Sequence, residues 1–378
     1  MHKIRKKCLA ASLALLPWVG MAQTNGVWTL QNCIDYAVAH NVQLLKSVAA
    51  EQSASVDVAE AKAGLLPSLS GAMTQGGNYR PFQESGGNFV NGGIATSAAD
   101  KVTQNGSYGI NAQWVVWNGG KNRMSITNAQ YNQQLAAYDT QTQVNEVKEQ
   151  IAQLYVQILY MTEAEKVNRT LLLQDSIICE RGQQMVNVGS MSKADLAQLQ
   201  SQVSQGQYNV VNVQTQIDNA KMQLRQLMEL PADEAFDVQP VDATDVQVLN
   251  SIPSKDAIYS SALDSRPEIK RSQLAIEQSH LSTKIAKSGY LPTISLTGGI
   301  GDSHMTGSQT NWAKQMKNNF NGSLGVTVSI PIFDNRKNKS AVERAKVAET
   351  TAQLDLQDTQ KQLYQTIETY WLNATNSQ

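Results

Sequence analysis

The side chains that most often perform chemistry in proteins are few and scattered in this 378-residue chain. His40, His280 and His304 stand alone, with no histidine–glutamate pair at metal-ligand spacing and no serine–histidine–aspartate context. Cys33 and Cys179 lie on segments that we expect to be far apart, so we predict no disulfide between them. We therefore predict that the protein is not an enzyme and that it holds no metal and no cofactor.

The first 22 residues have the three parts of a secretory signal. A basic start (3–7) leads into an apolar run (8–19), and the small-residue sequence Gly20-Met21-Ala22 offers a cleavage site. Cleavage after Ala22 removes four basic residues and lowers the formal charge from −1 to −5, which does not favour nucleic-acid binding. The alternative, a membrane-spanning anchor, is disfavoured because the run is far shorter than the ~20 residues that a spanning helix needs.

Two pairs of segments alternate apolar and polar side chains with the period of a β-strand. They lie near 69–73 and 108–116, and again at 293–300 and 320–330. One face is apolar and the other is small and hydroxylated, as in membrane-spanning barrels with strands of about 10 residues. The residues that we assign to the outward apolar face are Tyr108, Ile110, Trp114, Val116, Ile294, Leu296, Phe320, Leu324, Val326 and Val328.

Four strands cannot close a barrel alone, so any barrel must be shared between chains. Alternation by itself also permits an exposed hairpin whose apolar face packs on a neighbouring domain. The loops between the strands, at about 76–106 and 301–319, are rich in Gly, Asn and Ser and are predicted to be surface loops.

The chain repeats itself once. Residues 37–71 match residues 262–296 at an offset of 225, and a second piece places Trp117 on Phe333 at an offset of 216. Each copy has the order helix, proline, strand, loop, strand, helix, which indicates a duplicated unit rather than a solenoid. We place the helix–strand junctions at Pro67, Pro292 and Pro331.

Long helices account for much of the remaining sequence. One helix is expected from about Lys121 to Met185, about 100 Å long at 1.5 Å per residue. Apolar residues at steps of three and four run from Leu196 to Leu227, the pattern of a coiled-coil seam. Helices from about Gln31 to Pro67 and from Ser192 to Leu230 are about half as long, which predicts two stacked helices beside the long one.

The turn between the long helix and the next one reads as a hairpin tip. Gly189 is placed to end the first helix, and Ser192 with Asp195 three residues later is a capping-box arrangement for the second. Without further information a tip of this kind is either a simple turn or a binding surface.

Several short sequences in this order and spacing resemble one family. They are Trp28-Thr-Leu with Ala-Val-Ala-His-Asn after it, the Leu-Pro pair before each outgoing strand, Trp-Asn-Gly-Gly-Lys at 117–121, Val-Gly-Ser…Asp-Leu at 188–196, and Leu-Asp-Ser-Arg-Pro-Glu-Ile at 263–269. From Trp28 onward the chain resembles the TolC-like outer-membrane efflux protein family.

The resemblance implies an α+β membrane protein with long antiparallel coiled-coil helices and four β-strands per chain. Three chains would then form a 12-stranded β-barrel in the outer membrane of a Gram-negative bacterium, above a periplasmic helical tunnel. The tip residues Val188, Gly189 and Ser190 would contact a periplasmic adaptor (membrane fusion) protein that couples to an inner-membrane pump. The implied function is a passive outer-membrane duct of a tripartite efflux or secretion system.

The resemblance also orders the domains. Residues 23–230 are assigned to the first structural repeat, 231–254 to an equatorial linker and 255–378 to the second repeat. By the offset of 216, the second hairpin tip is expected beyond Gln378, so the second repeat is expected to stop before it.

A second function, a secreted trimeric coiled-coil structural or adhesive protein, competes with the duct. Aromatic side chains distinguish the two, because Tyr108, Trp114, Trp117 and Phe320 are placed near strand ends, as interface aromatics are in membrane barrels.

Overall fold

The computed structural model describes residues 26–79, 81–82, 87–90, 93–96, 101–231, 235–240, 252–306 and 311–377. The signal segment 1–22 and most of the linker 231–254 lie outside these residues. The chain divides into two compact units, one containing 1–46 and 142–250 and the other containing 47–141 and 251–378. Within the described ranges, no helix combines the length and the apolar character that crossing a lipid bilayer requires.

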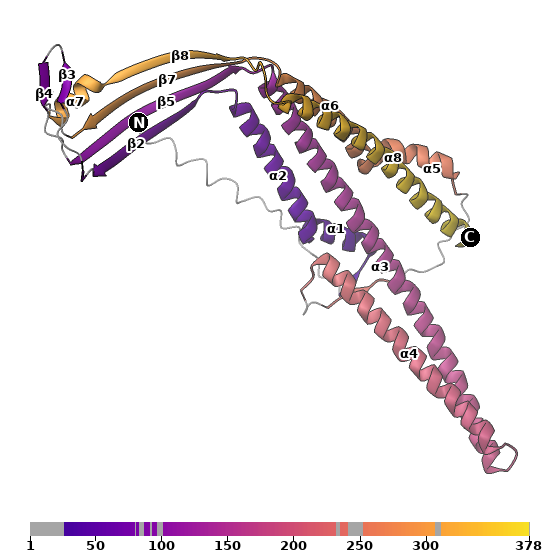
Figure 1. Ribbon diagram of the computed structural model, residues 1–378. Helices are drawn as coiled ribbons and strands as arrows, with labels where there is room; N and C mark the ends of the chain where they lie inside the picture. The colour runs from indigo at the N-terminus through magenta and orange to yellow at the C-terminus, as the bar shows by residue number, and fades with distance from the viewer. Residues whose placement is uncertain are drawn as a thin grey trace, which may run out of the picture. The chain divides into compact units, whose positions relative to one another are not determined.

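The second unit is built around a four-stranded antiparallel sheet with the order β2-β5-β7-β8 (Figure 1). Its strands are β2 (Ser68–Tyr79), β5 (Val102–Trp117), β7 (Thr293–Met305) and β8 (Asn321–Ser329). These are the four segments whose alternation predicted strands. Each alternates because it presents one face to apolar surroundings and the other to polar ones.

The expected surface loops contain more structure than the sequence pattern indicates. Strands β2, β5 and β7 extend into them, and they also hold a short hairpin of β3 (Gly87–Val90) and β4 (Gly93–Thr96). A helix, α7 (Trp312–Asn319), precedes β8, and the Asn311 side chain caps it by accepting from the Lys314 amide. The prediction of plain loops at 76–106 and 301–319 was therefore wrong in these parts.

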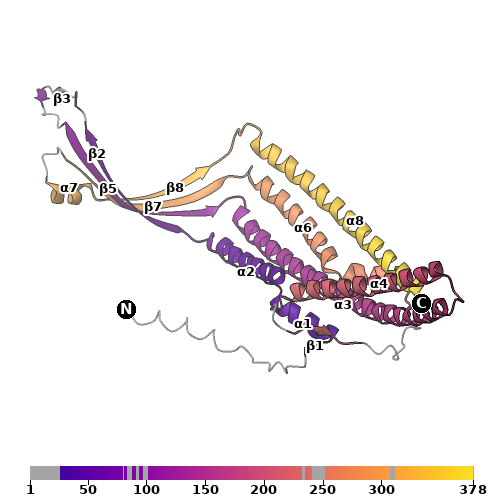
Figure 2. The same ribbon diagram turned by 90° about the horizontal axis from the view of Figure 1, so that it is seen from below.

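Long helices continue from the strands at one end of the sheet (Figure 2). The helix α2 (Val42–Ala63) leads to β2, and α6 (Pro267–Ser288) leads to β7. The helix α3 (Lys121–Asn187) follows β5, and α8 (Lys337–Ser377) follows β8 and packs along α6. As predicted, α3 runs without a break for 67 residues.

The duplication is visible in the bounds of the elements. At the offset of 225, α1 (Leu30–His40) falls on α5 (Lys255–Ser265) and α2 falls on α6, at both ends of each helix. At the offset of 216, the first residue of α3 falls on the first residue of α8. Even the left-handed backbone is repeated, because Gly119 and Gly120 with φ of 66° and 80° correspond to Asn335 and Arg336 with φ of 50° and 66°.

The first unit is a coiled-coil hairpin in which α4 (Lys193–Met228) lies beside α3 down to the turn (Figure 1). Its core joins the predicted seams of both helices and adds residues of α1. The shared core comprises Cys33, Ala37, Val147, Ile151, Tyr155, Ile158, Met161, Ile217, Ala220, Leu224, Met228, Leu230 and Val238.

Tyr155 and Cys33 are two residues of this core with polar side-chain atoms. Tyr155 donates its hydroxyl to the carbonyl oxygens of Trp28 (3.2 Å) and Gln239 (3.1 Å), at the end of the parallel pair β1 (Val27–Trp28) and β6 (Asp237–Val238). The predicted linker therefore contains a strand. Burial raises the pKa of the Cys33 thiol to about 12, so this cysteine stays a protonated core side chain at neutral pH.

The prediction of one helix from Gln31 to Pro67 was wrong, because the chain breaks at Asn41 between α1 and α2. Asn41 is 5 % exposed. Its Oδ1 accepts from the backbone amides of Gln43 and Leu44, capping α2, while its Nδ2 donates to the Leu227 carbonyl (2.9 Å) near the end of α4. One side chain therefore joins the start of α2 to the end of α4.

Replacing Asn41 should weaken the first unit. We expect Asn41→Ala to cost about 1–3 kcal/mol, because it removes a helix cap and leaves the half-buried Leu227 carbonyl without this donor. The matched variant Asn41→Ser keeps a side-chain acceptor for capping α2 and loses the bond to the Leu227 carbonyl, so it should cost less. Urea unfolding followed by circular dichroism measures both; equal stability of Asn41→Ala and the wild type would contradict this role.

Candidate functional site

The register of the sheet separates its residues into two faces. Residues that are directly opposite on neighbouring strands carry their side chains on the same face, as Trp114 and Leu296 or Leu296 and Val326 do. The apolar face defined in this way carries Leu69, Met73, Tyr108, Ile110, Ala112, Trp114, Ile294, Leu296, Ile300, Leu324, Val326 and Val328. The other face carries Ser70, Thr74, Ser107, Asn111, Gln113, Ser295, Thr297, Ser323 and Thr327.

The apolar face has a definite length. Along β7 it runs from Ile294 to Ile300 and reaches its first charged residue at Asp302. The eight steps from Ile294 to Asp302, the length of this face before its first charge, measure about 27 Å at about 3.4 Å per residue. A strand tilt of about 40° reduces this to about 21 Å across a bilayer, close to the apolar band of ~25 Å in outer-membrane barrels.

Aromatic side chains lie near both ends of the apolar face. At the end nearer the helices, the Trp114 indole N–H donates to the Leu65 carbonyl (2.8 Å), and Trp117 lies opposite Ile294. At the other end Tyr108 stacks on His304, with ring centroids 5.8 Å apart. Rings that combine an apolar body with a polar tip are suited to a membrane–water interface.

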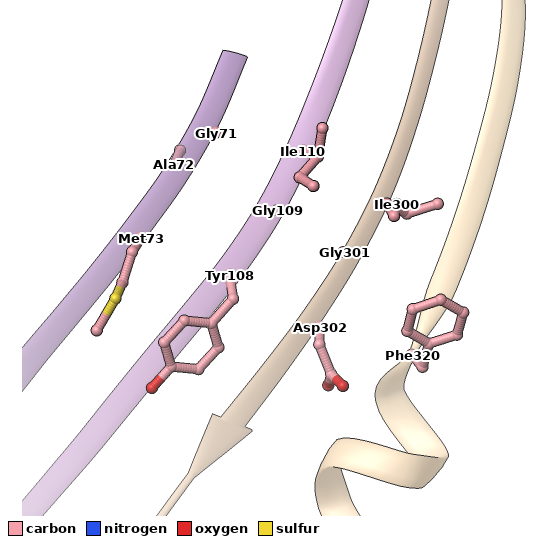
Figure 3. Close-up of a pocket in the computed structure, with 10 residues that line it drawn as sticks. All are labelled: Gly71, Ala72, Met73, Tyr108, Gly109, Ile110, Ile300, Gly301, Asp302 and Phe320. Atoms are coloured by element: carbon pink, nitrogen blue, oxygen red, sulfur yellow. The ribbon is translucent and has the colours of Figure 1, made fainter. Parts of the chain in front are cut away.

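A hollow of about 480 Å³ lies on the apolar face near its outer end (Figure 3). Met73, Tyr108 and Ile110 line it from β2 and β5, and Ile300 and Asp302 from β7. Phe320, the residue before β8, lies on its other side (Figure 3). Asp302 is its one charged lining residue, so the hollow is a groove of this surface without an acid–base pair.

The predicted outward residue Val116 lies at an irregularity. The register shifts between Val115 and Trp117, so that Val116 and Trp117 together oppose Ile294 across the strand pair. This bulge lies at the end of β5, just before the glycine turn into α3.

The three predicted junction prolines all lie where strands meet helices. Pro67 and Pro292 immediately precede β2 and β7, and Pro331 lies between the end of β8 and the start of α8. Proline is compatible with these sites because no helix or ladder hydrogen bond is required of its nitrogen there.

The predicted tip is the turn between α3 and α4. Gly189 has φ of 80°, its amide donates to Val186 O, and the Ser190 amide donates to Met185 O, the pattern of a Schellman motif. Val188 is 80 % exposed. A Cβ on Gly189 would meet nothing within 4 Å, so the tip is open to the outside.

Ser192 caps α4, with the Asp195 amide donating to its Oγ (3.1 Å). The predicted capping box is closed differently from the standard one, because the Asp195 carboxylate accepts from the Ser192 hydroxyl (2.8 Å). The shorter Asp side chain explains the difference from a glutamate, which reaches the backbone amide.

The three scattered histidines remain apart in the fold. His280 Nδ1 lies 3.3 Å from Glu349 Oε1, His40 Nδ1 lies 2.8 Å from the Tyr36 carbonyl, and His304 stacks on Tyr108. In the part of the chain that the structure describes, no three His, Cys, Asp or Glu side chains meet as metal ligands.

A four-stranded sheet with one apolar face, joined to a helical hairpin of this length, defines a class of outer-membrane channel proteins. The model of the family "Outer membrane efflux protein" matches residues 33–229 and 258–378. The chain belongs to this family. Its place is the outer membrane, and it functions there as an efflux duct.

Individual proteins agree with this assignment. The chain is 26 % identical to the outer membrane protein TolC of Escherichia coli over 372 residues, 95 % of this chain and 70 % of that protein. It is 23 % identical to the outer membrane efflux protein BepC of Brucella suis, over 98 % of this chain and 75 % of that protein. The solved structure of CusC, described with transmembrane channel formation, has the same fold, with a TM-score of 0.73, 16 % identity and coverage of 92 % and 76 %.

Single cysteines on neighbouring residues of β8 should show which face meets lipid. We expect Leu324→Cys to react with a membrane-soluble maleimide and Ser323→Cys with a charged one, because the two side chains lie on opposite faces. Labelling of intact outer membranes, quantified by mass shift, measures this. Equal reaction of both cysteines with the charged reagent would exclude a lipid-facing surface here.

Proposed function

We propose that three copies of the chain form a closed 12-stranded barrel and act as the passive exit duct of a tripartite efflux or secretion system. The observation that carries the proposal is the sheet itself: β2 and β8 are edge strands, and one face between them is apolar over the thickness of a membrane. An open edge in lipid would leave backbone groups without partners, so the sheet must be closed by other copies.

The polar face then lines the lumen. Its Ser, Thr, Asn and Gln side chains carry no charge, so they offer water and solutes a hydrated path without binding one class of ion strongly. The driving force for export would come from an inner-membrane pump, as the resemblance to the efflux family implies. The membrane-fusion adaptor would link that pump to the tip.

The competing function, a secreted adhesive coiled coil, predicts a different location for the same apolar face. Membership of an outer-membrane efflux family argues against it. The adhesive role would also leave the large apolar residues Leu324 (84 % exposed) and Met73 (75 % exposed) facing water.

Fractionation and export together test the proposal. We expect the full-length protein in the outer-membrane fraction as a trimer that survives moderate heating in detergent, because closing the barrel pairs every edge. A strain that lacks the gene should lose export of the pump's substrate and recover it on complementation. Soluble monomers in the periplasm would contradict the duct.

The tip offers a more specific test. Replacing Gly189 by Trp should lower export about tenfold or more while trimers still assemble, because the tip contains no residue of the four strands and a bulky side chain would obstruct the adaptor. Gly189→Asn is the matched control, since asparagine tolerates the left-handed backbone and adds little bulk. Normal export by Gly189→Trp with intact trimers would overturn the tip assignment.

A further inference from the structure

The internal duplication predicts how neighbouring copies meet. Inside one chain, β5 and α3 return from the first copy of the repeat and lie against β7 and α6, which lead into the second copy. β8 and α8 return from the second copy and correspond to β5 and α3. β2 and α2 lead into the first copy and correspond to β7 and α6. Because β8 and β2 are the two edge strands, they are free to make the equivalent contact between chains.

The strand register can be transferred directly. In the chain, Ala112 of β5 lies opposite Gly298 of β7. Adding 216 to the first residue and subtracting 225 from the second places Val328 of one copy opposite Met73 of the next. The neighbouring pair Asn111 and Gly299 becomes Thr327 opposite Thr74 in the same way.

The transferred register preserves both faces. Val328 and Met73 belong to the apolar face, and Thr327 and Thr74 belong to the polar face, although nothing in the transfer requires this agreement. A shift by one residue would bring Val328 against Thr74 and turn every side chain of one strand to the wrong side.

The helices supply an independent match. Arg271 on α6 and Asp139 on α3 form an ion pair inside the chain. Their transferred positions are Lys46 on α2 and Asp355 on α8, again a cation on the outgoing helix and an anion on the returning one. In the described part of one chain, neither Lys46 nor Asp355 has an ion-pair partner, although both lie exposed on their helices.

A second contact between α3 and α6 is replaced by two small residues at the transferred positions. Asn132 and Gln278 are hydrogen-bonded between α3 and α6, and their transferred positions are Ala348 and Ser53. These small side chains leave room for the two helices to approach. The ion pair is therefore the polar contact that would fix the helices of neighbouring copies relative to each other.

We propose that each copy binds the next through β8 and β2 in this register, with Lys46 of one copy paired to Asp355 of its neighbour. The proposal rests on the trimer proposed above and adds the residues of its interface. A head-to-tail contact of this kind uses two different surfaces of each chain, so it closes into a ring when the rotation between copies allows.

Cysteine cross-linking tests the register. We expect the double variant Thr327→Cys with Thr74→Cys to give disulfide-linked trimers on mild oxidation, because directly opposite residues bring their Cβ atoms within disulfide reach. The matched control is Thr327→Cys with Ala72→Cys, on the same face but two residues out of register, and it should link at least tenfold less. Preferential linking of the control would overturn the register while leaving the trimer standing; absence of any trimer would contradict both.

Charge reversal tests the ion pair. Lys46→Glu and Asp355→Lys should each lower the fraction of trimers that survive heating several-fold, and the double variant should restore it. Lys62→Glu, the same change on the same helix away from the pair, should have a much smaller effect. If the losses of the two single variants add in the double variant, while Thr327→Cys and Thr74→Cys still cross-link, the ion pair would be overturned. The strand register would then still stand.

Discussion

Backbone hydrogen bonding at the two edges of the β2-β5-β7-β8 sheet is the constraint on which the rest of this structure depends. The inner strands β5 and β7 each pair with a strand on both sides, with one irregularity between Val115 and Trp117, whereas β2 and β8 each have one side open. In water such edges invite aggregation, and in lipid they are too costly to persist. In the proposed barrel, the apolar face contacts lipid and the open edges pair with further copies of the chain.

The internal duplication offers one way to pair these open edges. Each copy of the repeat supplies a strand pair and a helix pair, and we have proposed that the contact between the two copies inside the chain is repeated between chains. The helical part depends on side-chain hydrogen bonds rather than on strand pairing. There a single side chain, Asn41, caps the start of α2 and donates to the Leu227 carbonyl near the end of α4.

Sequence periodicity predicted the features that depend on local pattern. The four strands, the unbroken α3 and the turn at Gly189 follow from period-2 alternation, the absence of proline and left-handed glycine. The break at Asn41 was missed because its donor bond reaches Leu227, which no local pattern reveals. A signal was nevertheless present, since Pro267 marks the start of α6 and the offset of 225 transfers that start to the residue after Asn41. The β3–β4 hairpin and α7 lie among Gly and Asn residues whose periodicity is too weak to identify them.

The two copies are not equivalent where helices meet strands, and this limits how closely neighbouring chains can repeat the internal contact. A Cβ on Gly119 would lie 2.9 Å from Leu291 Cβ, so the internal contact requires glycine there. The corresponding residue, Asn335, has a Cβ in the same left-handed conformation. A neighbour's Leu66, which corresponds to Leu291 and is 68 % exposed, must therefore lie farther from Asn335 than Leu291 lies from Gly119. The strands can keep the internal register between chains, while the junctions beside them must be more widely spaced.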